Sequence, residues 1–271
     1  MKRRHLIELH EQPWFPEGLR STFQQTLSRV QTLFDIYRHA AAPFAAFLTR
    51  LGPTEVLDLC SGGTGPLLQL RSHLRDHMDA GSRPRFVLSD LYPDLARFEA
   101  LKAEYPAALD FVDHPVNAME VPDGLPRVRT MFAALHHFKP DQVVDILGDA
   151  ARRGDGIAIF EATRRTPLHL TTMAVSMAPL ALALHSWALR PWRPRHVLWG
   201  TFVPLVPLAF AFDATVSVLR SYTASELLAF TEQVDAPDFT WEVGSARMPY
   251  NGLSVQYLFG WRRSAEVTAT P

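Results

Sequence analysis

The sequence is poor in cysteine and in net charge, and each shortage excludes a class of protein. Its one cysteine, Cys60, excludes an intramolecular disulfide framework and a zinc site built from several cysteines, which suits a reducing compartment. The 27 basic and 28 acidic residues leave a formal charge of −1, so no overall field draws nucleic acid to the chain. We therefore expect no nucleic-acid partner.

The sequence also lacks an export signal and internal repeats. Its first residues, MKRRHLIELHEQPWF, begin basic, but charged and polar residues interrupt the apolar run that a signal peptide requires. We therefore expect a cytoplasmic location. At 271 residues, 47% of them hydrophobic, the chain can bury a large core.

Hydrophobic periodicity divides the chain into four segments. Residues 1–50 carry apolar residues at intervals of three and four, which predicts helices. Residues 51–163 alternate short β-rich runs with helical stretches, which predicts an α/β fold with a parallel sheet covered by helices. Residues 164–220 form an apolar insertion. Residues 221–271 contain an amphipathic helix and two strand candidates, FTWEV and LSVQYLFGW, which predict an antiparallel hairpin at a sheet edge.

A glycine cluster follows the first predicted strand, in the stretch VLDLCSGGTG. Gly62, Gly63 and Gly65 would let main-chain amides approach a polar or anionic ligand at the start of the next helix. Asp90 ends the second predicted strand, where a doubly wound nucleotide-binding sheet places the carboxylate that accepts ribose hydroxyls. Strand, glycines, helix and acid in this order predict a nucleotide-type site, whereas glycines alone would serve only a tight turn.

This arrangement resembles the class I S-adenosylmethionine-dependent methyltransferases, over about residues 54–163 and again over 221–262. The resemblance implies a Rossmann-like, mostly parallel sheet with an antiparallel last strand, and S-adenosyl-L-methionine as cofactor. It places an acid near the methionyl ammonium, the glycine turn near the cofactor backbone, a second acid on the ribose and the VNAME segment near adenine. The implied cofactor residues are Asp58, Cys60, Gly62, Gly63, Gly65, Asp90, Leu91, Asn117 and Ala118.

Two alternatives come from other classes of protein. A nicotinamide-dependent oxidoreductase shares the strand, the glycine turn and the distal acid, but its sheet usually continues in parallel. The paired strand candidates at the carboxy terminus favour methyl transfer over this alternative. A scaffold that binds S-adenosylmethionine without turnover is the second alternative.

The residues after the fourth and fifth predicted strands would face the transferred methyl group, because ligands in open α/β sheets bind beyond the carboxyl ends of the strands. His136 and His137 follow the fourth strand, and a neutral imidazole there could take a proton from a hydroxyl nucleophile. Packing of one histidine and helix capping by the other is the competing interpretation. Glu161 is an alternative base, and Tyr222 is a candidate substrate contact. No pair of residues has the spacing typical of metal ligands, so we assign no metal.

The apolar insertion contains two long runs without formal charge, Thr166–Leu189 and Val197–Phe212. The first is long enough to span a bilayer, whereas the second is shorter and carries two prolines. The joining segment RPWRPR would have to cross the membrane, which disfavours two spans. A helical hairpin on the membrane face or an apolar lid fits better, and an ordinary buried helical cap is the alternative. The preferred acceptor is therefore a lipophilic small molecule or lipid, methylated at oxygen.

Overall fold

A seven-stranded mixed sheet organises the protein. The computed structural model describes residues 1–62, 65–187, 204–248 and 253–265. The strand order is β3-β2-β1-β4-β5-β7-β6. The strands are β1 (Glu55–Leu59), β2 (Arg85–Leu88), β3 (Leu109–Phe111), β4 (Val128–Phe132), β5 (Gly156–Glu161), β6 (Phe239–Arg247) and β7 (Ser254–Arg262).

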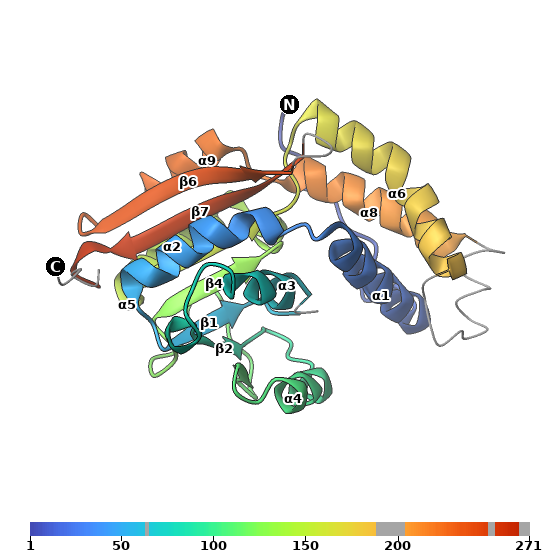
Figure 1. Cartoon of the computed structure of the whole chain (residues 1–271). Coiled ribbons are helices and arrows are strands. Elements are labelled where there is room, and N and C mark those ends of the chain that lie inside the picture. Colours follow the sequence, from blue (N-terminus) through green and yellow to red (C-terminus); the bar gives the residue numbers. More distant parts are fainter. Residues whose placement is uncertain (63–64, 188–203, 249–252, 266–271) are drawn as a thin grey trace.

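Strand direction confirms the fold class that the sequence predicts. The first five strands pair in parallel, and β7 lies between β5 and β6 and is antiparallel to both. The predicted hairpin is therefore the edge of the sheet, with its reversed strand inserted beside β5 (Figure 1). The turn of that hairpin, residues 249–252, lies outside the described residues.

Helices cover both faces of the sheet. They are α1 (Glu17–Phe34), α2 (Ala41–Leu51), α3 (Gly65–Leu74), α4 (Leu95–Glu104), α5 (Pro140–Arg153), α6 (Pro167–Trp187), α8 (Leu205–Arg220) and α9 (Ala224–Thr231), with short 3₁₀ turns at Arg38–Ala40, Ala80–Ser82, Leu135–His137 and Arg263–Ala265. Pro140 begins α5 and Gly154 caps its end, which is the usual asymmetry of helix termini.

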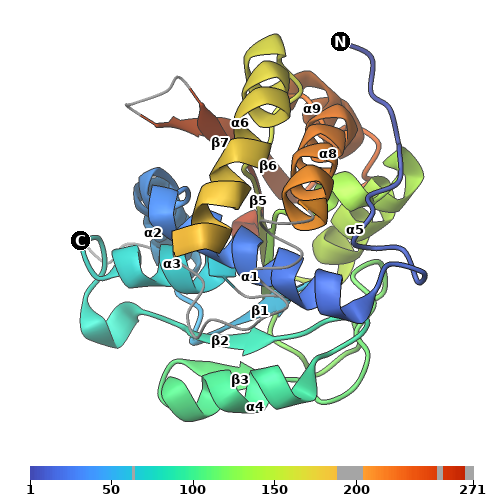
Figure 2. The ribbon, with the colours of Figure 1, turned by 90° about the vertical axis from the view of Figure 1, so that its right-hand side faces the viewer.

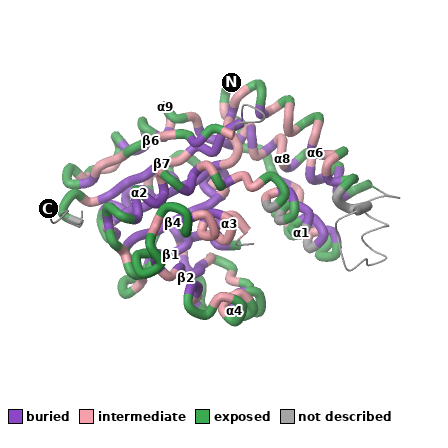
Figure 3. The backbone as a smooth tube through the Cα atoms, in the orientation of Figure 1, coloured by how far each residue is buried: buried purple, intermediate pink, exposed green. Residues whose placement is uncertain are grey.

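Alternating strand residues enter two separate cores. Val56 and Phe160 pack with α2 and α3 on one face, whereas Leu57 and Ile159 pack with α5 and α9 on the other. Because both faces are covered, β4 and β5 are buried along their whole length (Figure 3). This burial explains the apolar run of β5, GIAIFE.

A third apolar cluster joins the N-terminal region to the insertion. Helices α1, α6 and α8 pack together beyond the carboxyl edge of the sheet, and the rings of Phe23 and Phe210 lie 5.2 Å apart within the cluster (Figures 1 and 2). Residues 1–16 precede α1 as a non-helical segment that contains Pro13 and Pro16.

The two charge-free runs of the insertion contribute to α6 and α8. Residues 188–203, which include the RPWRPR segment, lie outside the described residues. Among the described helices, none alone has the length and apolar composition to cross a membrane. One pair bent by 51°, α8 with α9, meets those two criteria jointly.

Candidate functional site

The predicted glycine turn lies between β1 and α3. Cys60 and Gly62 have positive φ angles of 55° and 40°, which bend the chain sharply after the strand. A non-glycine residue in this conformation stores backbone strain, and such strain is concentrated at ligand sites. Gly63 lies outside the described residues, and Gly65 begins α3. Burial raises the pKa of the Cys60 thiol, so this cysteine stays protonated.

Asp90 joins the ends of β1 and β2. Its Oδ2 accepts a hydrogen bond of 3.0 Å from the Gly62 amide, and its Oδ1 accepts one of 3.0 Å from the Tyr92 amide. Leu91 is exposed beside it. The acid that the sequence singles out therefore holds the glycine turn in place, and each of its carboxylate oxygens has a further lone pair.

Asp58 is buried at the end of β1. Its carboxylate accepts hydrogen bonds from Thr130 Oγ1 at 2.9 Å and from Ser61 Oγ at 2.7 Å. Burial raises the pKa of Asp58 to about 7, although the two hydroxyl donors oppose the shift. A carboxylate with no cationic partner among the described residues is a suitable neighbour for a ligand's positive charge.

Asn117 and Ala118 lie in the turn after β3. The Val116 amide donates to the carbonyl of Asp90 at 2.9 Å, so this turn lies against the end of β2. Asn117 Oδ1 accepts a hydrogen bond from the Met119 amide at 3.0 Å, and Ala118 is buried. The structure thus brings the predicted cofactor residues that it describes to one edge of the sheet.

His136 and Glu161 form a buried pair at the same edge. The chain leaves β4 through Ala133, which has a φ of 48°, and the following 3₁₀ turn contains both histidines. His136 Nδ1 lies 2.7 Å from Glu161 Oε2, and Glu161 Oε1 accepts the Leu135 amide at 2.8 Å. Burial alone would lower the pKa of His136, but the charge and hydrogen bond of Glu161 raise it above the ordinary value.

His137 stacks beside His136 and has its own carboxylate. The ring centroids of the two histidines lie 4.1 Å apart, and a carboxylate oxygen of Glu11 lies against His137 Nδ1. Burial and the neighbouring His136 lower the pKa of His137. Burial would raise the pKa of Glu11, but His137 and Arg220 lower it to about 2. Glu11 is therefore ionised at neutral pH.

The N-terminal segment contributes acids that sequence reasoning missed. It runs alongside α8 and α5 (Figure 2), with the Arg4 amide donating to the Leu219 carbonyl at 3.0 Å. Glu8 is buried and lies 3.8 Å from His136 Nε2 and 3.5 Å from Arg220 Nη1. Glu8 and Glu11 lie more than 100 residues before the two histidines in the chain. No sequence spacing therefore indicates that these acids contact the histidines.

Tyr222 lies next to the histidine turn, and its hydroxyl forms a hydrogen bond within the protein. Its hydroxyl donates to the Phe138 carbonyl at 2.7 Å, and the Arg3 guanidinium lies 4.2 Å from its ring centroid. Burial raises the pKa of Tyr222 to about 12. Tyr222 therefore cannot act as a base at neutral pH, and its ring packs against Arg3 and Phe230.

Comparison with known proteins gives structural relatives only. No family model matches the sequence, and no curated protein matches it significantly. Human N-acetylserotonin methyltransferase, solved with S-adenosylmethionine, aligns with a TM-score of 0.51 and 13% identity over 91% of this chain and 56% of its own. The mitomycin 7-O-methyltransferase aligns with a TM-score of 0.46 and 17% identity over 83% of this chain and 54% of its own.

A third relative is an O-methyltransferase from neocarzinostatin biosynthesis, solved with S-adenosyl-L-homocysteine and 1,4-dihydroxy-2-naphthoic acid. Its TM-score is 0.49 and its identity 13%, over 89% of this chain and 58% of its own. This chain thus spans little more than half the length of these three proteins.

Proposed function

We propose that this chain, which has the class I methyltransferase fold, transfers a methyl group from S-adenosyl-L-methionine to a hydroxyl of a small molecule. One observation carries the proposal: the strained glycine turn with Asp90 and the buried His136–Glu161 pair meet at the carboxyl edge of the same sheet. The first is suited to a nucleoside with a charged tail, and the second to a nucleophile that must lose a proton.

The residues at the ends of β1, β2 and β3 fit this cofactor. Asp90 would accept the ribose hydroxyls, the open turn at Gly62 would lie against the cofactor backbone, and Asn117 would accept the exocyclic amine of adenine. Asp58 supplies the test of fit, because its buried carboxylate matches the ammonium of the methionyl group. When bound, the cofactor supplies an electrophilic sulfonium methyl group.

The histidine side of the site would activate the acceptor. Glu161 holds Nδ1 of His136 protonated, which leaves Nε2 as the nitrogen that faces a ligand. An acceptor hydroxyl placed there would give its proton to Nε2 as its oxygen attacks the methyl group, and S-adenosyl-L-homocysteine would be the leaving group. In-line positioning of the two reactants would provide much of the acceleration.

The apolar helices beyond this edge support a lipophilic acceptor. Large side chains of α6 and α8 remain exposed, among them Val175 (73%) and Leu208 (58%). A surface of this kind can receive an apolar molecule or rest on a membrane. The proposal therefore includes a lipophilic small molecule or lipid as acceptor, and a cytoplasmic protein peripheral to the inner face of a membrane.

Heavy-methyl labelling tests the proposed reaction. The full-length protein is incubated with lipid and small-molecule extracts and a cofactor that carries a deuterated methyl group, and products are identified by mass spectrometry. We expect a new product whose mass contains the labelled methyl group. A protein that binds the cofactor but labels nothing in any extract would instead be a scaffold.

The other alternative, a nicotinamide-dependent oxidoreductase, is disfavoured by the antiparallel direction of β7.

Removal of the Asp90 carboxylate is expected to weaken cofactor binding. Asp90→Ala would lose the ribose contact and release the amides of Gly62 and Tyr92, which should raise the Kd of S-adenosyl-L-homocysteine about 10- to 100-fold. Titration calorimetry measures the change. Asp94→Ala is the matched control, because Asp94 caps α4 through the Arg97 amide and should leave the affinity unchanged. Equal losses in both variants would contradict the assigned role.

Cofactor affinity is expected to rise with pH through about 7. The folded-state pKa of Asp58 is raised to about 7, so the carboxylate is largely protonated at pH 6 and attracts an ammonium group only as it ionises. If only the ionised form binds, the Kd of S-adenosyl-L-homocysteine should fall roughly eightfold between pH 6 and pH 7.5. Asp58→Asn should bind more weakly and show no such dependence. The same slope in both proteins would assign the effect to other groups.

A further inference from the structure

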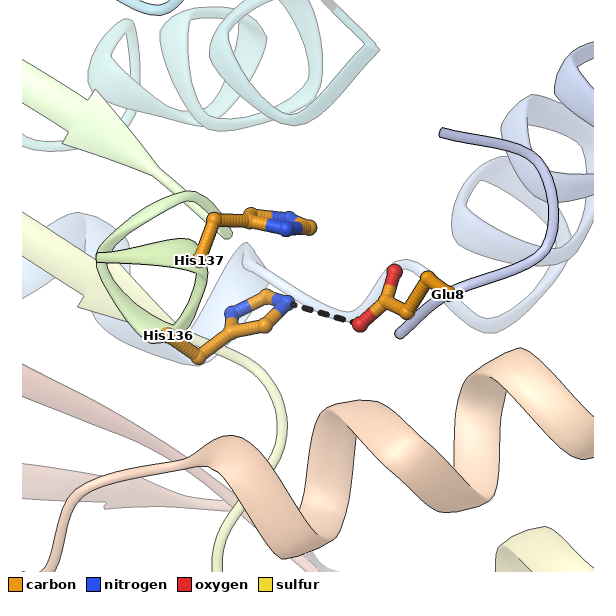
Figure 4. A group of neighbouring side chains, drawn as sticks. All are labelled: Glu8, His136 and His137. Carbon is orange, nitrogen blue, oxygen red and sulfur yellow. Dashed lines mark ion pairs between the residues drawn. The ribbon is translucent and has the colours of Figure 1, made fainter. Parts of the chain in front are cut away.

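Glu8, His136 and His137 bring three potential metal ligands together. One ligand atom from each lies within 4.8 Å of the others, and Glu8 and His136 are almost fully buried. Figure 4 shows the two imidazole rings one above the other on the turn after β4, both projecting toward the segment that carries Glu8. Two imidazoles and a carboxylate are the ligand set of several catalytic zinc sites.

Carboxylates orient both imidazoles from behind. Glu161 holds Nδ1 of His136, and Glu11 pairs with Nδ1 of His137. The second nitrogen of each ring makes no hydrogen bond to another described residue. Histidines that bind metals typically have this arrangement, in which a carboxylate on one nitrogen fixes the tautomer and leaves the other nitrogen to ligate.

The distances around Glu8 leave room for an ion. His136 Nε2 and Glu8 Oε1 are 3.8 Å apart, which is too long for a hydrogen bond. An ion with bonds of about 2.0–2.2 Å to each atom spans this separation. Ser217 Oγ donates to the same carboxylate oxygen at 2.8 Å, and Arg220 Nη1 lies 3.5 Å from it, so these two groups hold Glu8 in place.

The charges of the cluster favour a cation. Glu8, Glu11 and Glu161 are accompanied by two guanidiniums: Arg220 pairs with Glu8 and Glu11, and Arg3 Nη2 donates to the His136 carbonyl at 3.2 Å. Buried charges require compensation. With both imidazoles neutral, as ligation requires, the carboxylates outnumber the guanidiniums, so the net charge of this group is negative.

We propose that Glu8, His136 and His137 bind a divalent transition-metal ion of the Zn²⁺ type, with Glu161 and Glu11 as orienting partners. The three protein ligands leave a coordination position open. The use of this position rests on the proposed function. An acceptor hydroxyl bound there would have its pKa lowered by the ion. His136 would then act on the acceptor through the ion and not as a free base.

Metal binding by the full-length protein tests this site independently of methyl transfer. The protein is treated with a chelator, dialysed, and titrated with Zn²⁺ by calorimetry, and Co²⁺ is then added to record its visible absorption. We expect one Zn²⁺ per chain and a Co²⁺ spectrum of low coordination number. Glu8→Gln and His137→Gln should weaken Zn²⁺ binding at least about 100-fold, and Glu161→Gln about 10- to 100-fold.

Two variants keep the test decisive. Glu8→Gln leaves Arg220 paired with Glu11, at 3.1 Å, so the variant is expected to fold. His114→Gln removes an exposed histidine that pairs with Asp113 and should bind Zn²⁺ as the unaltered chain does. Zn²⁺ binding that survives Glu8→Gln, or its absence from a folded protein that still binds S-adenosyl-L-homocysteine, would overturn the metal site and leave the proposed methyltransferase standing. A chain that binds Zn²⁺ but not S-adenosyl-L-homocysteine would support the metal site and contradict the proposed methyltransferase.

Discussion

Replacement of His136 by glutamine is expected to lower kcat for methyl transfer by about 10²- to 10⁴-fold, the range typical of a lost group that activates a proton donor. Glutamine has a similar length but no ring nitrogen that Glu161 can hold in one tautomer. The effect should be the same in kind whether the imidazole acts on the acceptor directly or through an ion. The measurement is steady-state transfer of labelled methyl to the product identified by mass spectrometry.

Cofactor binding separates this effect from misfolding. Among the described residues, His136 forms no hydrogen bond or ion pair with Asp90, Gly62 or Tyr92, so the Kd of S-adenosyl-L-homocysteine should not change in the variant. His114→Gln serves as the control, because that histidine is exposed and should retain full turnover. Full turnover in both His136→Ala and His137→Ala would contradict the catalytic assignment even if the methyltransferase activity itself is found.

Removal of the Asp149 carboxylate is expected to cost about 3–5 kcal/mol in the free energy of unfolding, because it leaves a buried guanidinium unpaired. Arg129 on β4 and Asp149 on α5 are 3% and 2% exposed, with Nη1 and Oδ2 2.6 Å apart. Asp149 also accepts the Val121 amide at 3.3 Å. Burial lowers the pKa of Arg129, although Asp149 opposes the shift. Urea denaturation of Asp149→Ala measures the loss.

Two comparisons isolate the cause of this loss. The double variant Arg129→Met with Asp149→Leu removes both charges and should recover most of the stability, because no charge is left buried. The exposed pair Arg127–Asp155 is the matched control, and Arg127→Met should cost no more than about 1 kcal/mol. A similar loss from both pairs, or a double variant as unstable as Asp149→Ala, would contradict the explanation.

The fold could be predicted because its signals are local. Short runs rich in apolar residues, such as EVLDL and GIAIFE, form the strands of the sheet, and their alternation with helical stretches predicts a parallel sheet. The reversal of β7 followed from two strand candidates late in the chain. The packing of α1 against α6 and α8 did not follow, because apolar residues at helical spacing do not specify which partner covers them.

The site could be predicted only in part, because some of its contacts depend on how distant segments pack together. Asp90 and His136 each follow a strand, and the carboxyl ends of parallel strands meet at one edge. The contacts of Glu8 and Glu11 with the histidines depend on where the non-helical N-terminal segment crosses that edge. Arg220 ends α8 and reaches the same group only because of the packing of the insertion.

Titration calorimetry of the full-length protein with S-adenosyl-L-homocysteine, and separately with NAD⁺, tests the central claim most directly. The bend at Gly62 with Asp90 is proposed to hold an adenosyl group with a charged amino-acid tail. We expect one S-adenosyl-L-homocysteine per chain with micromolar affinity, weakened in Asp90→Ala, and no binding of NAD⁺. No binding of S-adenosyl-L-homocysteine by a folded protein, or binding of NAD⁺ in its place, would contradict the account.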